Sequence, residues 1–365
     1  MFSINNNKIA NDIINKIKKK NNNLKFMHVC GTHQDTLVKN GLDFLLKDCG
    51  IEIGQGPGCP VCVTTPKEIE EMITLAKTDK IVTTFGDMIR VPGQNQSLEN
   101  LKTEGYKIQT VYSIDDAISI AKKKKDKEIV FMAVGFETTA PTTASAILKK
   151  PPSNFSILCC HRTIPFALKS ILDMGELKID GLIEPGHVST IIGSKPYEFI
   201  SKEYKIPQVI AGFEPIDILM SALMLIKQIE KKSPFVENEY SRVVKRDGNI
   251  KAQSVIEKTF DICDIKWRGF PIIPKSGLIL KSDFNKYDAR IKFEDELIDL
   301  KNFKFKEPKG CRCGELLRGL ISPKDCPLFG VKCLPDSPIG PCMVSMEGSC
   351  NIDYKYSKKK LTLSN

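Results

Sequence analysis

The chain has 365 residues, 41% hydrophobic and 27% charged, which predicts an ordinary globular protein of about two to three domains. Its net charge of +10 comes mostly from dispersed lysines. The one tight cluster, Lys122 to Lys125, lacks the interleaved aromatic residues of nucleic-acid-binding segments, so we expect no nucleic-acid partner. The sequence shows neither a secretory signal nor the roughly 18-residue apolar run of a membrane span, so we expect a cytoplasmic protein without membrane attachment.

Residues 1–23 carry isoleucines at helical spacing and predict an amphipathic helix that packs on the body of the protein. From Leu24 to about Lys231, apolar strands alternate with helices, which predicts parallel sheets covered by helices on both faces. A strand followed by Gly-Phe-Glu occurs twice, at Gly135 and Gly212, and fits two similar halves. We therefore predict an α/β protein with two similar parallel-sheet domains around a cleft and a small cysteine-rich C-terminal domain, divided as follows: 1–23, 24–150, 151–300 and 301–365.

Two short cysteine motifs organise the first predicted domain. In the first motif an apolar strand ends at Cys30, and in the second, glycines and prolines frame Cys59 and Cys62. A thiol in such a turn can reach a ligand or another thiol. Thr65 is expected to cap the next helix, which places Cys62 just outside a helix N-terminus, where the dipole favours a thiolate. We interpret Cys59 and Cys62 as a redox or metal-binding pair; the alternative is two buried structural cysteines.

Polar side chains follow several of the predicted strands. Ligands of parallel α/β folds bind at the carboxyl ends of the strands. We therefore expect the following side chains, all in turns after strands, to converge on one cleft: Cys30, Glu137, His161, His187 and Glu214. The glutamates and His187 either line this cleft or hold their own loops through hydrogen bonds to the backbone.

Thirteen cysteines in a chain without a secretory signal favour metal and redox roles over structural disulfides. Six of them lie in a C-terminal segment rich in Gly and Pro: Cys311, Cys313, Cys326, Cys333, Cys342 and Cys350. Their spacing lacks the paired knuckles of zinc ribbons and suits four ligands of an iron–sulfur cube with two sulfurs left over. We expect Cys49, Cys159, Cys160 and Cys263 to be core residues. The adjacent Cys159 and Cys160 should point to opposite faces of one strand.

Together these motifs closely resemble those of the HypD family of hydrogenase maturation proteins. The matching segments are Cys30-Gly31-Thr32-His33, Gly56-Pro57-Gly58-Cys59-Pro60-Val61-Cys62, Gly135-Phe136-Glu137-Thr138-Thr139-Ala140-Pro141, Pro185-Gly186-His187-Val188 and the C-terminal cysteines. One position departs from the pattern, since the family's first motif usually ends in Glu and this chain has Gln34. If the family's Glu acts as a base, that function is lost here, because an amide cannot take up the proton. If the Glu only forms hydrogen bonds, the Gln34 amide can replace it.

The resemblance implies a scaffold, rather than a conventional metabolic enzyme, on which the Fe(CN)2CO unit of nickel–iron hydrogenase is assembled. It implies the small chaperone HypC and the maturation protein HypE as partners, with cyanide supplied through HypF and HypE. By the same resemblance Cys30 binds the iron, for which a low-pKa thiolate would be suitable, and Cys59 and Cys62 form a nearby redox pair. His33 is expected to help donate hydrogen bonds to the cyanide nitrogens, and Glu137 to line the cleft.

The resemblance also implies a [4Fe-4S] cluster like that of ferredoxin–thioredoxin reductase, in which a disulfide lies against the cube. On that pattern the cluster ligands are Cys311, Cys326, Cys333 and Cys350, and the adjacent thiol pair is Cys313 and Cys342. The cluster and the two thiol pairs would form a relay of dithiol–disulfide steps.

Two other interpretations remain open. The first is an iron–sulfur-dependent thiol–disulfide oxidoreductase that acts on protein disulfides, which leaves Cys30 and the Glu137 loop unexplained. The second is a purely structural metal protein, in which Cys30 would be dispensable.

Overall fold

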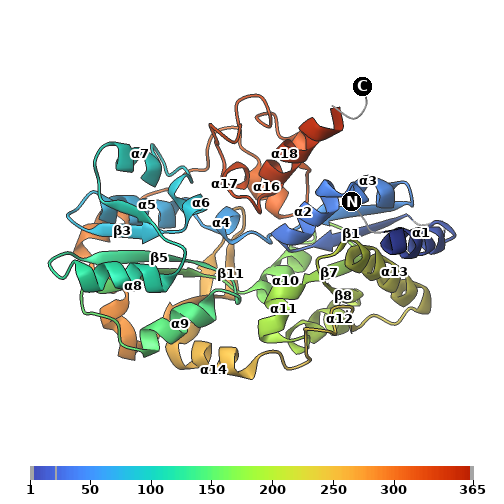
Figure 1. The fold of residues 1–365 in the computed structure, drawn as a ribbon, viewed down its shortest axis with the longest axis horizontal. Helices are drawn as coiled ribbons and strands as arrows, with labels where there is room; N and C mark the ends of the chain where they lie inside the picture. The colour runs from blue at the N-terminus through green and yellow to red at the C-terminus, as the bar shows by residue number, and fades with distance from the viewer. Residues whose placement is uncertain (1–3, 21–22, 362–365) are drawn as a thin grey trace.

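The protein, described by a computed structural model over residues 4–20 and 23–361, has two α/β lobes side by side (Figure 1). The C-terminal segment lies over the junction of the lobes (Figure 1). Each lobe contains one parallel sheet, as predicted for the fold class. No helix in the described ranges is both long and apolar enough to cross a membrane.

The five-stranded sheet forms the lobe on the right of Figure 1. Its order is β2 (Ile51–Gln55), β1 (Leu24–His28), β7 (Gly181–Pro185), β8 (Gln208–Ala211) and β9 (Val236–Asn238). All neighbouring strands pair in parallel, and His28 lies opposite both Gln55 and Ile183. The turns that follow β1, β2 and β7 are therefore neighbours at one edge of the sheet.

The four-stranded sheet forms the other lobe. Its order is β4 (Ile108–Thr110), β3 (Ile81–Thr84), β5 (Ile129–Gly135) and β6 (Phe155–His161), again all parallel. Every residue of β5 and β6 is buried, as their nearly continuous apolar sequences predict for strands covered on both faces. An antiparallel hairpin of β10 (Phe260–Lys266) and β11 (Ile272–Leu280) contacts β6.

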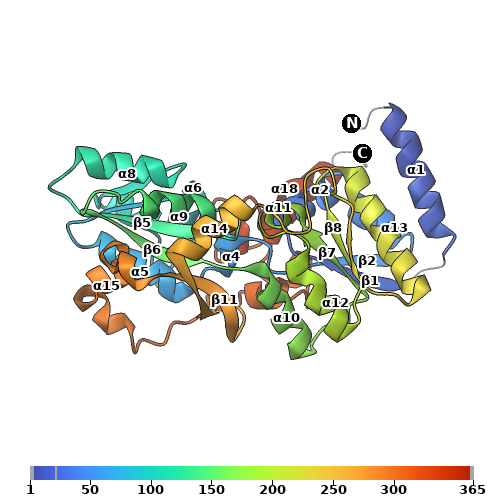
Figure 2. The ribbon, with the colours of Figure 1, turned by 90° about the horizontal axis from the view of Figure 1, so that it is seen from below.

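Helices cover both sheets (Figures 1 and 2). The five-stranded lobe carries α1 (Ile4–Lys18), α2 (Gly31–Lys39), α3 (Leu42–Lys47), α11 (Gly186–Ile192), α12 (Glu198–Tyr204) and α13 (Pro215–Lys231). The four-stranded lobe carries α5 (Pro66–Ala76), α6 (Gly86–Ile89), α7 (Leu98–Thr103), α8 (Ile114–Lys123), α9 (Ala140–Leu148), α14 (Ile250–Thr259) and α15 (Ala289–Lys292). Short 3₁₀ helices span Lys195–Tyr197, Ser282–Tyr287, Asp295–Leu300 and Pro323–Asp325.

The predicted N-terminal helix is present as α1, which packs along α13 (Figure 2). Ile13, Ile14 and Ile17 of α1 are buried in the apolar cluster that α13 also enters. Residues 1–3 and 21–22 of the predicted 1–23 segment lie outside the described residues.

The chain crosses between the lobes three times, so the predicted halves 24–150 and 151–300 do not correspond to the two sheets. Residues 24–55 and 181–238 supply the five-stranded sheet, and residues 81–161 supply the four-stranded sheet. The first crossing passes through α4 (Pro60–Val63), the second through α10 (Ile164–Met174), and the third leads from β9 to α14. Parallel strands need crossover connections, and here two of these connections run from one sheet to the other. The Cys59 and Cys62 motif thereby lies at the junction.

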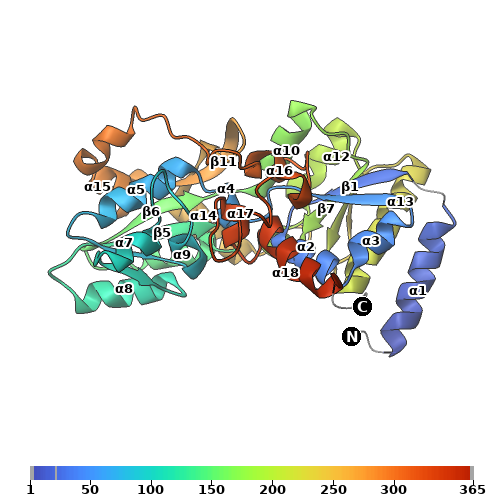
Figure 3. The same ribbon diagram turned by 90° about the horizontal axis from the view of Figure 1, so that it is seen from above.

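The C-terminal segment contains α16 (Cys313–Leu317), α17 (Pro341–Val344) and α18 (Ser349–Leu361), and lies between the lobes (Figure 3). It is tied to the five-stranded lobe by the Tyr356 hydroxyl, which donates to Asp35 of α2 at 2.9 Å. The backbone N–H of Met346 donates to Asp87 of α6, in the other lobe, at 3.1 Å. The six C-terminal cysteines are therefore held against both lobes.

Candidate functional site

Cys30 lies in the turn between β1 and α2, and its side chain is 7% exposed. Burial raises the pKa of the Cys30 thiol to about 11, although the backbone N–H groups of His33 and Thr32 oppose this rise. The negative charge of Glu347 raises the pKa further. Burial thus outweighs the backbone N–H groups at the start of α2 and favours the protonated Cys30 thiol. A metal ion bound here would have to displace a proton.

The two histidines of this turn are buried and neutral. Burial is the main reason that the pKa of His28 falls to about 4 and that of His33 to about 3. The Cys30 backbone N–H donates to Nδ1 of His28 at 3.4 Å, so Nε2 of His28 carries the proton and donates to Oε1 of Gln34 at 2.9 Å. The Gln34 amide thus has a hydrogen-bonding role, since it fixes the ring that supports the Cys30 turn.

The ring of His33 presents an unpartnered acceptor. Its Nε2 donates to the carbonyl oxygen of Gly212 at 3.0 Å, so Nδ1 of the neutral ring carries no proton. This Nδ1 is buried and has no hydrogen-bond partner. His33 packs on Phe213, whose ring stacks on His187 at 3.8 Å between centroids, so the turns after β1, β7 and β8 do meet. His33 therefore offers an acceptor at Nδ1 in place of the predicted donor.

Cys59 and Cys62 form a disulfide with Cα atoms 5.3 Å apart, and both side chains are 0% exposed. Cys59 is the N-cap of α4, and its Sγ accepts from the backbone N–H of Cys62 at 3.1 Å. Cys62 precedes α5 as predicted, but it lies within a separate turn of helix, α4, whose N-cap is Cys59. The predicted cap of α5 is confirmed, with Thr65 and Glu68 in a reciprocal capping box.

Three sulfur-bearing segments meet around Gly31. Its backbone N–H donates to the carbonyl oxygen of Gly58 at 3.3 Å, so the loop leading to Cys59 lies against the Cys30 turn. On another side, a Cβ added to Gly31 would overlap Glu347 of the C-terminal segment. Cys30, the disulfide and the C-terminal cysteines are therefore brought to one junction.

All six C-terminal cysteines line a single pocket. The Sγ atoms of Cys313 and Cys342 lie 2.6 Å apart, and α16 and α17, which carry them, both contact α4. Burial, followed by the charge of Cys313, raises the pKa of Cys311 to about 12. In the described part of the chain, no three His, Cys, Asp or Glu side chains already adopt the spacing of metal ligands. The structure thus gathers the six sulfurs around one pocket.

Two carboxyl groups are buried near the Tyr197 hydroxyl. Burial raises the pKa of Glu137 to about 7 and that of Glu184 to about 8. Oε1 of Glu137 accepts from the backbone N–H of Ile164 at 2.9 Å, whereas its Oε2 and both oxygens of Glu184 have no partner. Burial and then the charges of these glutamates raise the pKa of Tyr197. The sequence analysis did not select Glu184 as a candidate site residue. Its position as the one acidic residue in the otherwise apolar strand β7 was a signal that could have identified it.

His161 binds the end of β5 and the neighbouring helix α9, and Glu214 caps its own helix. Nε2 of His161 hydrogen bonds to Oγ1 of Thr143 at 2.9 Å. Glu214 is exposed, and its backbone N–H donates to Asp217 within the cap of α13 at 3.1 Å. Ring packing thus joins the turns of Cys30 and His187, whereas His161 and the exposed Glu214 make their contacts elsewhere.

The cysteines predicted to be core residues are mostly buried. Cys49, Cys159 and Cys160 are buried, whereas Cys263 is half-buried. Cys159 and Cys160 enter different apolar clusters, which confirms that they face opposite sides of β6.

The chain is similar to known hydrogenase maturation proteins along almost its whole length. Residues 6–357 match the HypD family model, described as "Hydrogenase formation hypA family". A putative hydrogenase expression/formation protein of Methanocaldococcus jannaschii is 48% identical over 96% of this chain and 97% of the relative. The hydrogenase maturation factors HypD2 of Bradyrhizobium diazoefficiens and HypD of Cupriavidus necator are 43% and 42% identical, each over 92% of this chain and 90% of the relative. The chain therefore belongs to the HypD family of hydrogenase maturation factors.

Proposed function

We propose that this chain is the scaffold on which the Fe(CN)2CO unit of a nickel–iron hydrogenase is assembled, with Cys30 as the ligand of its iron. The observation that carries the proposal is the meeting of Cys30, the Cys59–Cys62 disulfide and the six-cysteine pocket at one junction. A single metal-binding thiol beside two groups of redox-active sulfur suits a site that both holds iron and receives electrons. The partners we expect are HypC and HypE, with cyanide supplied through HypF and HypE.

The surroundings of Cys30 support the binding of the iron substrate. Thiolate is a soft ligand suited to ferrous iron. When the thiol loses its proton, the backbone N–H groups of Thr32 and His33 favour the anion, as their effect on the Cys30 pKa shows. The bare Nδ1 of His33 can accept a hydrogen bond from a protonated group that enters the site.

The C-terminal pocket fits a [4Fe-4S] cluster, because six thiols and apolar side chains line it. When bound, such a cluster supplies one-electron transfer. Since Cys313 and Cys342 lie 2.6 Å apart, they suit a thiol pair, which leaves four sulfurs as ligands: Cys311, Cys326, Cys333 and Cys350. These thiols would lose their protons on binding the cluster.

The two sulfur pairs suit an internal exchange of electrons. Cys59 and Cys62 form a disulfide, Cys313 and Cys342 are thiols, and all four enter one apolar cluster. An oxidoreductase that acts on protein disulfides would need a pair at its surface, whereas Cys59 and Cys62 are both 0% exposed. This burial favours a relay that serves Cys30 over a reaction with large protein substrates.

Infrared spectroscopy of the anaerobically purified protein, with HypC present, tests the proposal. We expect bands in the cyanide and metal-carbonyl regions that are lost in Cys30→Ala. The matched control is Cys49→Ala, which removes a thiol of similar burial (6% against 7% exposed) and should keep the bands. The absence of bands from wild-type protein that carries its partner would overturn the scaffold proposal.

A further inference from the structure

The segment of residues 267–269, just after β10, binds the end of the helix that carries the disulfide. The backbone N–H of Arg268 donates to the carbonyl oxygen of Val63, the residue after Cys62, at 2.9 Å. Nε of Arg268 donates to the carbonyl oxygen of Thr64, also at 2.9 Å. Arg268 thus satisfies two carbonyl groups at the C-terminal end of α4, where a positive charge is favourable.

The same segment contacts the helix that carries Cys313. Gly269 has a φ of +80°, and a Cβ built on it would come under 3.0 Å from the backbone of Gly314. Cys313 directly precedes Gly314, so the segment contacts a chain neighbour of each sulfur pair.

The guanidinium group of Arg268 is buried, with one nitrogen left unpartnered. The side chain is 1% exposed. Nε is bound to Thr64, and Nη1 donates to Oε2 of Glu307 at 2.7 Å. Nη2 is buried without a hydrogen-bond partner, which is costly for a charged donor. Two fixed nitrogens determine the plane of the group, so the direction of the free N–H is also determined.

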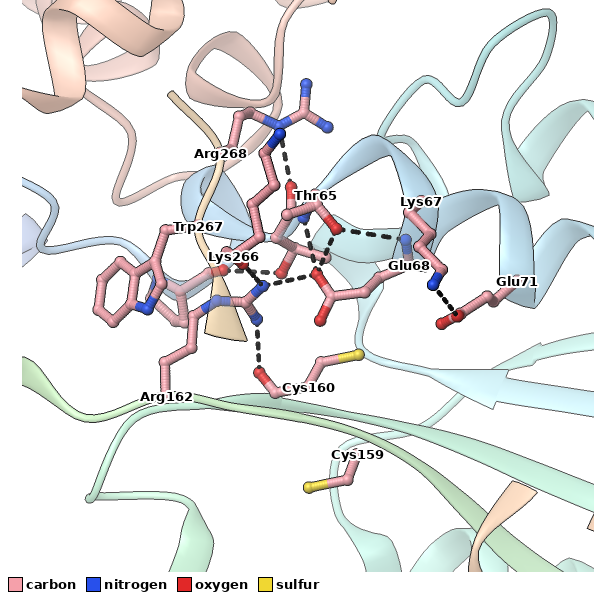
Figure 4. A network of polar contacts seen from close by, with 12 residues as sticks. Thr65, Lys67, Glu68, Glu71, Cys159, Cys160, Arg162, Lys266, Trp267 and Arg268 are labelled. Atoms are coloured by element: carbon pink, nitrogen blue, oxygen red, sulfur yellow. Dashed lines mark hydrogen bonds and ion pairs between the residues drawn. The ribbon is translucent and has the colours of Figure 1, made fainter. Parts of the chain in front are cut away.

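The neighbouring side chains hold this segment rigidly. Figure 4 shows Trp267 and Arg268 beside Arg162 and the capping box of Thr65 and Glu68. The Trp267 ring stacks on Phe136, and its Nε1 donates to Oγ of Ser276 at 2.9 Å. The position of Arg268 is therefore set by packing on both sides.

We propose that Arg268 is a positioning residue for electron exchange between the Cys313/Cys342 pair and the Cys59–Cys62 disulfide. The inference rests on the proposed function, in which these two pairs exchange electrons. Exchange proceeds through a thiolate, and an anion in this apolar junction is unfavourable without a counter-charge. Arg268 supplies that charge, and its free Nη2 is a donor for the anionic sulfur.

The exchange is balanced within the chain. The bond between the sulfurs of Cys59 and Cys62 breaks, and a bond between those of Cys313 and Cys342 forms. Two electrons pass from the second pair to the first, and the two thiol protons follow them. No outside oxidant or reductant is consumed.

The experiment follows the position of the disulfide in the full-length protein. The protein, purified without oxygen, is reduced with dithiothreitol, separated from it and given one molar equivalent of oxidised glutathione. Alkylation and mass spectrometry at successive times then measure the fraction of each cysteine pair that is oxidised.

We expect Arg268→Met to slow the movement of the disulfide between the two pairs at least about tenfold, as the loss of a hydrogen bond to a charged group implies. Arg268→Lys keeps the charge and should recover part of the rate.

Two further variants separate this role from a structural one. Glu307→Gln removes the carboxylate that competes for the Arg268 charge, at a side chain 45% exposed, and should speed the exchange. Arg290→Met is the matched control, because Arg290 also binds a backbone carbonyl, that of Cys159, and pairs with carboxylates, those of Glu71 and, at 3.9 Å, Glu68. This control should leave the rate unchanged.

The outcomes distinguish the inference from the function on which it rests. A wild-type rate in Arg268→Met, or equal slowing in Arg290→Met, would overturn the role of Arg268. If Arg268→Met does not fold, as judged by circular dichroism, Glu307→Gln decides, and a wild-type rate there overturns the inference. A disulfide that never moves between the pairs in wild-type protein would instead contradict the proposed relay.

Discussion

The backbone of Cys30 lies directly against Gly58, because a Cβ built on Gly58 would come under 3.0 Å from the Cys30 nitrogen. The opposing atoms belong to the backbone, so they cannot rotate away as a flexible side chain can. The carbonyl oxygen of Gly58 also accepts from Gly31 at 3.3 Å. This contact sets the separation between the Cys30 turn and the loop that leads to Cys59.

Gly58→Ala should therefore destabilise the protein by about 1–3 kcal/mol, the usual cost of forcing a group into packed structure. Urea denaturation measures the change. Gly86→Ala is the control, because its added Cβ would meet its nearest atom, Cγ2 of Thr110, at an ordinary 3.6 Å. Equal stability of the two variants would show that the Cys30 turn and the Gly58 loop can separate freely.

Glu184 should make stability fall as the pH rises. Burial raises its pKa in the folded protein to about 8 from the ordinary 4.5, so the folded state keeps a proton that the unfolded chain loses. The unfolding free energy should decrease between these two pH values. Glu184→Gln cannot ionise, and it should raise the melting temperature at pH 8 by about 2 °C or more while changing it little near pH 4.5.

The control for this pH dependence is Glu198→Gln, since Glu198 is exposed and pairs with Arg246 at the surface. Its melting temperature should follow that of the wild type across the same pH range. A Glu184→Gln variant with the wild-type pH profile would mean that Glu184 ionises normally in the folded protein.

Glu68 and Arg162 form a buried ion pair, with 2.6 Å between Oε2 and Nη2 (Figure 4). Burial alone would raise the pKa of Glu68, but the charges of Arg162 and Arg290 hold it below its ordinary value. Glu68→Gln leaves a buried charge uncompensated and should cost about 3–5 kcal/mol at neutral pH, measured by urea denaturation. The difference should shrink in acid, because the wild-type ion pair is lost as the pH falls through the lowered pKa of Glu68.

The matched control for this ion pair is Glu176→Gln, because Glu176 is exposed and its partner Arg318 is only half-buried. An exposed pair contributes only about 0–1 kcal/mol, so this change should be small. Similar losses in the two glutamate variants would contradict the importance of burial.

The division of the C-terminal cysteines is tested by iron and sulfide analysis of anaerobically purified variants. If Cys326 is a cluster ligand and Cys342 belongs to the thiol pair, Cys326→Ser should lose most of its iron and Cys342→Ser should keep it. The reason is that Cys342 already has a sulfur partner, Cys313, at 2.6 Å. Retention of iron in Cys326→Ser together with its loss in Cys342→Ser would reverse the assignment.

Local features were predictable because neighbouring residues decide them. The capping box of Thr65 and Glu68 depends on residues three positions apart, and the buried strands β5 and β6 are apolar along nearly their whole length. The opposite orientation of Cys159 and Cys160 follows from the two-residue period of a strand. By contrast, the sequence analysis did not predict the separate turn of helix α4, which contains Cys62 and has Cys59 as its N-cap.

By itself, the sequence determined the α/β class, the cysteine motifs and the family, since these reside in local composition and spacing. Only the tertiary structure decided which strands share a sheet, because pairing of β1 with β7 joins segments more than 150 residues apart. It also decided the protonation of Cys30 and Glu184 and the free donor of Arg268. Burial and the charges of distant neighbours set these properties, and neither is visible until the chain has folded.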